Sequence, residues 1–313
     1  MTVFCTESTQ HTRTWVVDEL VARGHEVDEV QVPEGRPRHA ALAGNHAADS
    51  WFIDPPDCAL ALGWEAGLAA HVAAREPRVP VVVRLSQAAR EHGSDRARLE
   101  VALARSSALA LVPSTGELDR VAELGVPRRL LRVLPEAVDL RRFHDDAVPD
   151  DVVPDDAART ARRRHRVAVT GAQALEALRR LPGCETLVLA EPPTADGATA
   201  VLGSVDLVVA DDDRDRDVAA VLVGMACGVP SVARGPGALV DVVADGVTGI
   251  VVPRHADVTE PLRSLLTDPM RRQSMGMAAV DRVRARFAST VVGDTLERLL
   301  TEAAGRREPA AAS

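Results

Sequence analysis

The sequence predicts an α/β protein built from two Rossmann-like domains, each with a parallel sheet. Short aliphatic runs alternate with helical patterns along the chain, and Gly or Pro bounds many of these runs. Apolar runs of this kind are typical of strands that are buried on both faces and joined by crossover helices. A polar segment interrupts the alternation near the middle of the 313 residues, which are enough for two domains.

The first domain is expected over residues 1–142. Its predicted strands are 2–5, 26–30, 58–62, 79–83 and 108–112. Helices are predicted at 14–23 and in three stretches that end near residues 74, 104 and 124.

Residues 143–164 are expected to form a linker, because they are acidic and then Arg-rich, contain prolines and lack apolar periodicity.

The second domain is predicted over 165–288, with strands at 167–170, 185–190, 206–210 and 231–233. Its helices are predicted at 172–181, 217–227, 238–243, 257–266 and 269–286. A last helix, 289–304, is expected to pack back toward the first domain, before a disordered tail at 305–313. A ligand is expected in a cleft between the domains, at the carboxyl ends of the strands.

The composition excludes several kinds of chemistry. All 37 basic residues are arginine, and the chain has neither lysine nor tyrosine. Schiff-base catalysis, pyridoxal-phosphate catalysis and a P-loop each need a lysine, so all three are excluded. The net charge of −9 argues against non-specific binding to nucleic acid or anionic lipid.

The cysteines and the apolar segments indicate a cytoplasmic protein. Cys5, Cys58, Cys184 and Cys227 are far apart, and each lies in an apolar stretch, as buried reduced thiols do. The N-terminus has no secretory signal pattern. The longest uncharged stretch, 218–233, is shorter than the roughly 18 residues of a membrane helix, so no transmembrane segment is expected.

Four segments, in order along the chain, carry a resemblance to a known family. The most specific is the run MACGVPSVA at 225–233 followed by GALVDVVADGVTGIVVP at 237–253; the others are LVARGHEV at 20–27, VLPEAVDLRRF at 133–143 and LLTDPMRR at 265–272. Together they resemble retaining glycosyltransferases of the GT-B fold, and the resemblance covers nearly the whole chain. It implies two Rossmann-like domains with parallel sheets facing a central cleft.

The resemblance also implies an activity. Members of this family bind a nucleoside diphosphate sugar against the second domain and an acceptor on the first. The expected reaction moves a hexosyl group to a small-molecule or lipid acceptor with retention. The nucleotide sugar is then a co-substrate, and no metal is expected.

The family's pair of glutamates, eight residues apart, falls here on Asp215 and Val223. The first member contacts the sugar, so Asp215 is a catalytic candidate. Valine cannot accept a hydrogen bond from ribose. The family's diphosphate-binding arginine falls on Ala172, and no lysine follows it. Arg234, or Arg214 with Arg216, could supply the missing positive charge.

The remaining candidates surround the same expected site. Gly171, Gly235 and Gly237 are expected to bring the backbone close to phosphate, and Asp241 stands where the family has a glutamate. His11, in the turn after the first strand, is the acid–base candidate. Each also has an ordinary structural interpretation: a turn for the glycines, a helix cap for Asp241, a solvated loop for the acidic run 211–217 and a surface loop for His11.

Three functional hypotheses remain open. The first is an active glycosyltransferase. The second is a catalytically degenerate GT-B homologue that binds a ligand or assists a partner glycosyltransferase, since the diphosphate cations and the second glutamate are absent. The third is a sugar-nucleotide epimerase or another GT-B enzyme.

Overall fold

The computed structural model describes residues 1–85, 94–143, 165–189, 201–211, 214–235, 237–254 and 256–305. Its contacts divide the chain into two compact units. The first is Met1–Pro135 together with Val292–Ser313, and the second is Glu136–Val291. The predicted linker and tail lie outside the described residues, apart from the backbone of Phe143 and Gly305.

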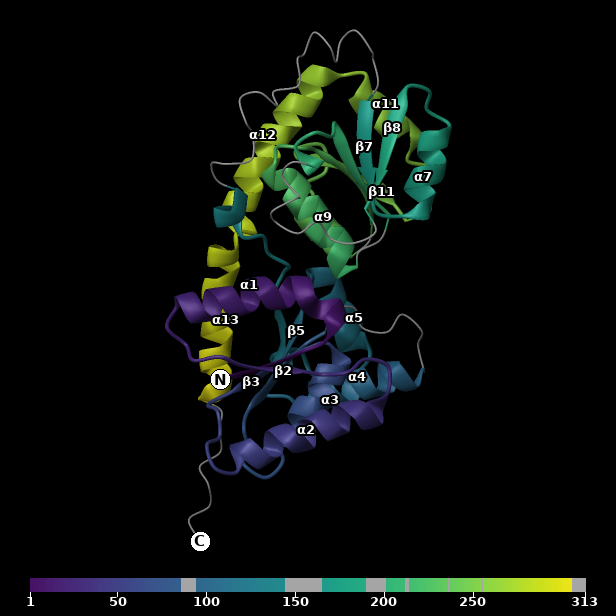
Figure 1. The fold of residues 1–313 in the computed structure, drawn as a ribbon. Coiled ribbons are helices and arrows are strands. Elements are labelled where there is room, and N and C mark those ends of the chain that lie inside the picture. The colour runs from purple at the N-terminus through teal and green to yellow at the C-terminus, as the bar shows by residue number, and fades with distance from the viewer. Residues whose placement is uncertain are drawn as a thin grey trace. The chain divides into compact units, whose positions relative to one another are not determined.

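The first unit is built on a parallel sheet in the order β2-β1-β3-β4-β5-β6 (Figure 1). Its strands are β1 (Thr2–Cys5), β2 (Asp28–Gln31), β3 (Ala59–Leu62), β4 (Val81–Arg84), β5 (Leu109–Val112) and β6 (Leu131–Val133). Its helices are α1 (Gln10–Ala22), α2 (Pro37–Trp51), α3 (Trp64–Ala73), α4 (Asp95–Ser106), α5 (Thr115–Glu123) and most of α13 (Ser289–Ala304). In Figure 1, α2, α3 and α4 gather on one side of this sheet.

Every residue of β1, β3, β4 and β5 is buried, which explains why these strands read as continuous apolar runs. Side chains of successive residues point to opposite faces. Phe4, Ala61 and Val83 therefore share one core, into which α2 brings Ala47 and Trp51. The rings of Phe4 and Trp51 meet edge to face with their centroids 5.6 Å apart.

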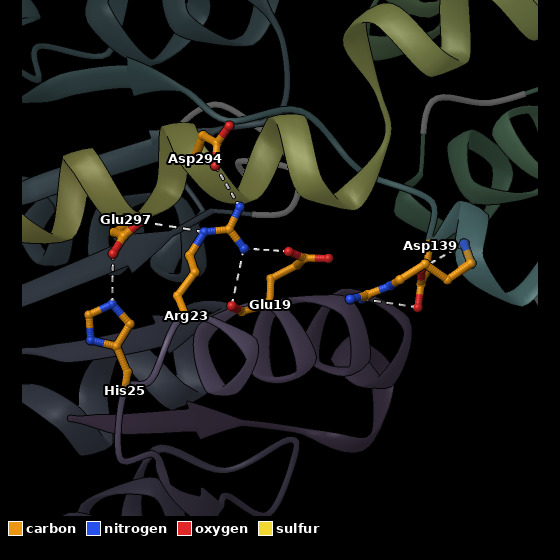
Figure 2. A network of polar contacts seen from close by, with 7 residues as sticks. Glu19, Arg23, His25, Asp139, Asp294 and Glu297 are labelled. Atoms are coloured by element: carbon orange, nitrogen blue, oxygen red, sulfur yellow. Dashed lines mark hydrogen bonds and ion pairs between the residues drawn. The ribbon is translucent and has the colours of Figure 1, made fainter.

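One arginine joins α1 to α13, as Figure 2 shows. Arg23 follows α1 and forms a short ion pair with Glu19, whose side chain is only 2% exposed. Its Nη2 is 2.7 Å from Asp294 Oδ1, and its Nε is 3.4 Å from Glu297 Oε2. The guanidinium lies against Gly293, where a Cβ would be 2.9 Å from Nη1. The network therefore connects residues 271 positions apart in the sequence.

The second unit has its own parallel sheet, in the order β11-β10-β9-β7-β8. Its strands are β7 (His165–Val169), β8 (Cys184–Val188), β9 (Leu207–Ala210), β10 (Ser231–Gly235) and β11 (Gly249–Pro253). Its helices are α7 (Ala172–Arg179), α9 (Asp215–Ala226), α10 (Ala238–Val242), α11 (Thr259–Leu266) and α12 (Pro269–Arg286).

The central strand β9 divides the core of this unit into two. Val208 and Ala210 pack in the cluster that holds α9, whereas Leu207 and Val209 pack in the cluster that holds α7 and α11. Helix α9 approaches β9 closely, because a Cβ on Gly224 would be 2.6 Å from the Cγ2 atom of Val208. The C-terminal part of α9 therefore packs directly against β9.

Among the α-helices and strands of the described residues, the sequence patterns do not predict α2, β6 and β11. Helix α2 is rich in Ala and polar residues, so its apolar periodicity is weak. Strand β6 has three residues, one of which is an arginine. Strand β11 lies at an edge of the sheet, follows a glycine-containing turn and ends in proline. Its local sequence, taken without its neighbours in the sheet, therefore favours a loop.

All four cysteines are free; Cys5 and Cys58 are buried, and Cys184 and Cys227 are half-buried. Burial raises the pKa of the Cys58 thiol to about 12 and that of the Cys227 thiol to about 11. Both thiols are therefore protonated and poorly reactive at neutral pH. Within the described ranges, no helix has the length and apolar character needed to cross a membrane.

Replacing Gly276 by alanine is expected to lower the free energy of unfolding by about 3 kcal/mol. Its Cβ would lie 2.0 Å from the carbonyl oxygen of Gly228, a backbone atom that cannot rotate away. Gly116→Ala in α5 is the matched control, because a Cβ there meets nothing within 4 Å. Urea unfolding measures the free energy of unfolding of both variants. Equal stability of the two would contradict the close packing of α12.

Replacing Arg23 by leucine is expected to cost roughly 3 kcal/mol, because the carboxylate of Glu19 stays buried while losing this cation. Arg128→Leu is the control, since the Arg128–Asp119 pair is exposed and worth at most about 1 kcal/mol. Thermal or urea unfolding compares the two. A loss no larger than that of the control would show that the network does not hold α13.

Candidate functional site

A cavity of about 470 Å³ opens at the carboxyl edge of the second sheet. This edge is where parallel α/β sheets present helix N-termini and bind their ligands. The residues that line the cavity come from the ends of β7, β9 and β10, from the starts of α7 and α9, and from the turn after β11: Thr170, Gly171, Ala172, Gln173, Asp211, Arg214, Arg216, Asp217, Arg234 and Arg254.

Arginines dominate this lining. Arg214 and Arg216 lie at the start of α9, Arg234 is on β10, and Arg254 follows β11. Arg234 is 7% exposed, and its Nη1 donates to the carbonyl oxygen of Arg254 at 3.2 Å. Its side chain is therefore held in place rather than free to move in solvent.

Two aspartates whose side chains are largely buried lie beside two of the arginines. Asp211 Oδ1 is 3.6 Å from the Nε atom of Arg234, and Asp217 Oδ1 is 3.6 Å from the Nε atom of Arg216. Both distances are ion-pair distances and too long for hydrogen bonds. Four arginines and two aspartates give the described lining a net charge of two positive units.

Asp211 also caps helix α7. Its Oδ2 accepts a hydrogen bond of 2.7 Å from the backbone N–H of Ala174. Glycine is needed at position 171, because a Cβ there would lie 2.5 Å from the same oxygen. A carboxylate of the chain itself therefore sits at the positive end of α7, where an anionic ligand would otherwise be favoured.

The hydroxyl of Thr170 is a further polar group of the lining. This residue is 8% exposed, and its Oγ1 is buried with no hydrogen-bond partner among the described residues. Buried hydroxyls normally have a partner, so an unpartnered hydroxyl in the wall of a cavity marks a polar group that a ligand could engage.

The structure brings some of the predicted site residues together. Gly171 and Arg234 line the cavity, whereas Asp215, the first residue of α9, does not. Neither Gly235 nor Gly237 lines it, nor does Asp241. Gly237 has a φ of +132° and precedes α10. The backbone oxygen of Asp241 accepts a hydrogen bond from Arg282.

His11 belongs to the first unit, where it is half-buried in the first turn of α1. The turn before it binds a carboxylate of the protein itself, that of Glu34. The backbone N–H of Ser8 donates to Glu34 Oε1 at 2.6 Å. Chiefly through this hydrogen bond, the pKa of Glu34 is lowered from its ordinary value.

Two family positions identified in the sequence have apolar side chains in the structure. Ala172 is the first residue of α7 and brings no charge to the cavity. Val223 is 2% exposed and packs in the core cluster of α9, so it offers no acceptor for a ribose.

Thr170, Asp211, Asp217 and Arg254 were not singled out from the sequence, although they line the cavity. A sequence signal exists for two of them. Asp211 directly follows the predicted strand 206–210, and Arg254 directly follows the run that ends at residue 253. Residues in these places reach the carboxyl edge of a parallel sheet.

Solved structures with the same architecture cover almost the whole chain. Sucrose-phosphate synthase from Thermosynechococcus elongatus superposes with a TM-score of 0.76 at 14% identity, over 96% of this chain and 98% of that one. HepE from Anabaena, solved with UDP and glucose, gives 0.74 at 14% identity, over 96% and 99%. HepE has also been solved with UDP-glucose. The chain has the glycosyltransferase GT-B fold.

Similarity to curated proteins is local. A 62-residue match to the D-inositol 3-phosphate glycosyltransferase of Kribbella flavida is 47% identical and covers 19% of this chain and 15% of that protein. A 129-residue match to the enzyme of the same name from Corynebacterium aurimucosum is 33% identical and covers 40% and 30%. The matched parts thus span less than a third of these relatives. No family model matches the chain.

Replacing Gly171 by alanine is expected to cost about 1–2 kcal/mol, the worth of a helix cap, because the new Cβ displaces the Asp211 carboxylate from α7. In an Asp211→Ala background the same change should cost much less, since the cap is already absent. Urea unfolding of the four proteins gives the coupling energy. A coupling near zero would contradict the cap geometry.

Proposed function

We propose that this protein is a glycosyltransferase that binds a nucleoside diphosphate sugar in the arginine-lined cavity of the second unit. The observation that carries the proposal is that cavity, with four arginines at the carboxyl edge of the sheet. The GT-B fold and the UDP and UDP-glucose complexes of HepE support a nucleotide-sugar donor.

The chemistry that the cavity can supply is charge stabilisation. When a glycosyl bond to a diphosphate breaks, negative charge develops on the leaving oxygen, and fixed cations lower the energy of that state. Arginine suits this role, since its planar donors bind phosphate oxygens in pairs. In this chain the role of stabilising the diphosphate charge would belong to Arg214, Arg216, Arg234 and Arg254. In the family it belongs to an arginine and a lysine at the positions that start here with Ala172.

The finer parts of the proposal come from the family resemblance. We propose transfer of a hexosyl group with retention, with Asp215 orienting the sugar and His11 as the acid–base candidate. The curated relatives are named for D-inositol 3-phosphate, so an inositol phosphate is the first small-molecule acceptor to test. A lipid acceptor and the cytoplasmic location stay predictions.

A second candidate is a degenerate GT-B homologue that binds a ligand or assists a partner glycosyltransferase. Val223 is buried in the core, so at this position the protein has no side chain that could accept hydrogen bonds from the ribose hydroxyls of a nucleotide. This difference from the family supports the second candidate. An assay separates the two candidates. Hydrolysis or transfer that releases UDP from UDP-glucose supports the enzyme, whereas UDP binding without turnover on any acceptor supports the homologue.

The variant Arg214→Gln/Arg254→Gln is expected to weaken UDP binding at least tenfold, because a hydrogen bond to a charged group is worth about 1.5–3 kcal/mol. Binding of uridine, which has no phosphate, should be unchanged. Arg263→Gln in α11 is the control, since Arg263 is exposed and pairs with Glu260 away from the cavity. Calorimetric titration measures each affinity.

The proposal fails if the unmodified protein binds no UDP at millimolar concentration. It also fails if the double variant binds UDP as tightly as the control does, since the diphosphate would then lie elsewhere.

A further inference from the structure

We infer that Asp211 is a built-in competitor of the ligand's diphosphate, which it opposes at Arg234 and at the N-terminus of α7. The inference rests on the proposed anion-binding role of the cavity and adds a residue that sets its affinity.

Asp211 already occupies the groups that a phosphate would contact. The carboxylate of Asp211 holds two groups that would attract a phosphate: its Oδ2 takes the N–H of Ala174, and its Oδ1 is 3.6 Å from Arg234 Nε. Both side chains of this ion pair are buried, with 9% and 7% exposure. Solvent therefore screens their interaction weakly, and a phosphate that enters meets a nearby negative charge.

The wall of the same cavity contains a buried polar group that the described residues leave without a partner. Thr170 lines the cavity, and its Oγ1 atom is buried and has no hydrogen-bond partner among the described residues. Strand β7 ends at Val169, directly before Thr170, and the helix that Asp211 caps begins at Ala172. The cavity therefore has room for a ligand beside the position that Asp211 fills, and Thr170 provides a hydroxyl in its wall.

The net charge of the cavity lining determines how Asp211 affects the binding of a diphosphate. The described lining carries a net charge of two positive units with Asp211 ionised, and three without it. A diphosphate that bears two or more negative charges must therefore compete with Asp211 for Arg234. Asp211 should weaken the binding of a diphosphate and speed its release after the sugar has left.

The test is Asp211→Asn, which removes the charge and keeps an oxygen that can accept from Ala174, because asparagine caps helices as well as aspartate does. Asp268→Asn is the matched control. Asp268 caps α12 in the same unit by accepting from the N–H of Arg271 at 2.9 Å, and it does not line the cavity. Both variants change the net charge of the chain by the same amount.

Inorganic pyrophosphate, UDP and uridine are titrated calorimetrically into the unmodified chain and both variants. Asp211→Asn should bind pyrophosphate and UDP about tenfold more tightly than the unmodified chain, because a like charge within a few ångströms of the phosphate is gone. Uridine binding should not change. Asp268→Asn should match the unmodified chain with all three probes.

The pyrophosphate ratio decides the inference, and the comparison of UDP with pyrophosphate decides the proposed function. Unchanged or weaker pyrophosphate binding by Asp211→Asn overturns the inference, even if UDP binds well. Tighter pyrophosphate binding with no preference for UDP supports the inference and counts against a nucleotide-sugar donor. Absence of pyrophosphate and UDP binding in all three proteins overturns both.

Discussion

In each unit of this protein, a carboxylate of the chain binds a backbone N–H in the turn or helix that follows the unit's first strand. In the first unit Glu34 accepts from Ser8, and in the second Asp211 accepts from Ala174. A parallel sheet gathers such N–H groups at its carboxyl edge, where they favour negative charge. The chain supplies that charge itself, and in the second unit Asp211 Oδ1 also lies 3.6 Å from the Nε atom of Arg234.

The consequence is clearest in the second unit. Asp211 occupies the N-terminus of α7 and also forms an ion pair with Arg234, the most buried arginine of the cavity. The family resemblance predicts phosphate-binding cations just after the first strand of this domain, where this chain has Ala172. The arginines of the cavity come instead from α9, β10 and the turn after β11, so positive charge reaches the cavity from several elements.

Local patterns in the sequence predict the buried strands, because β1, β4, β5 and β9 are short aliphatic runs with clear ends. They do not predict β6 or β11, which contain polar or helix-breaking residues and lie at sheet edges, where only pairing with a neighbour stabilises them. Likewise the motifs place Gly171 and Arg234 at one expected site, and both residues line the cavity. The pairing of Arg234 with Asp211 could not be assigned, since it joins residues from different strands and depends on the tertiary fold.

The acidic run 211–217 illustrates the same limit. As a sequence it is compatible with a solvated loop, yet the side chains of Asp211 and Asp217 are largely buried beside arginines, while Asp215 lies at the start of α9 outside the cavity lining. Helix geometry and the close approach of Gly224 to β9 decide which of these carboxylates faces inward. Spacing to a family motif points to this segment, but it does not determine which of its side chains line the cavity.

The central claim is that the arginines of the second unit form a diphosphate site. A crystal structure of the protein with UDP tests it most directly. The account predicts phosphate oxygens within hydrogen-bond distance of Arg234 and at least one of Arg214, Arg216 and Arg254, with Thr170 Oγ1 beside them. Phosphates bound away from this cavity would contradict it.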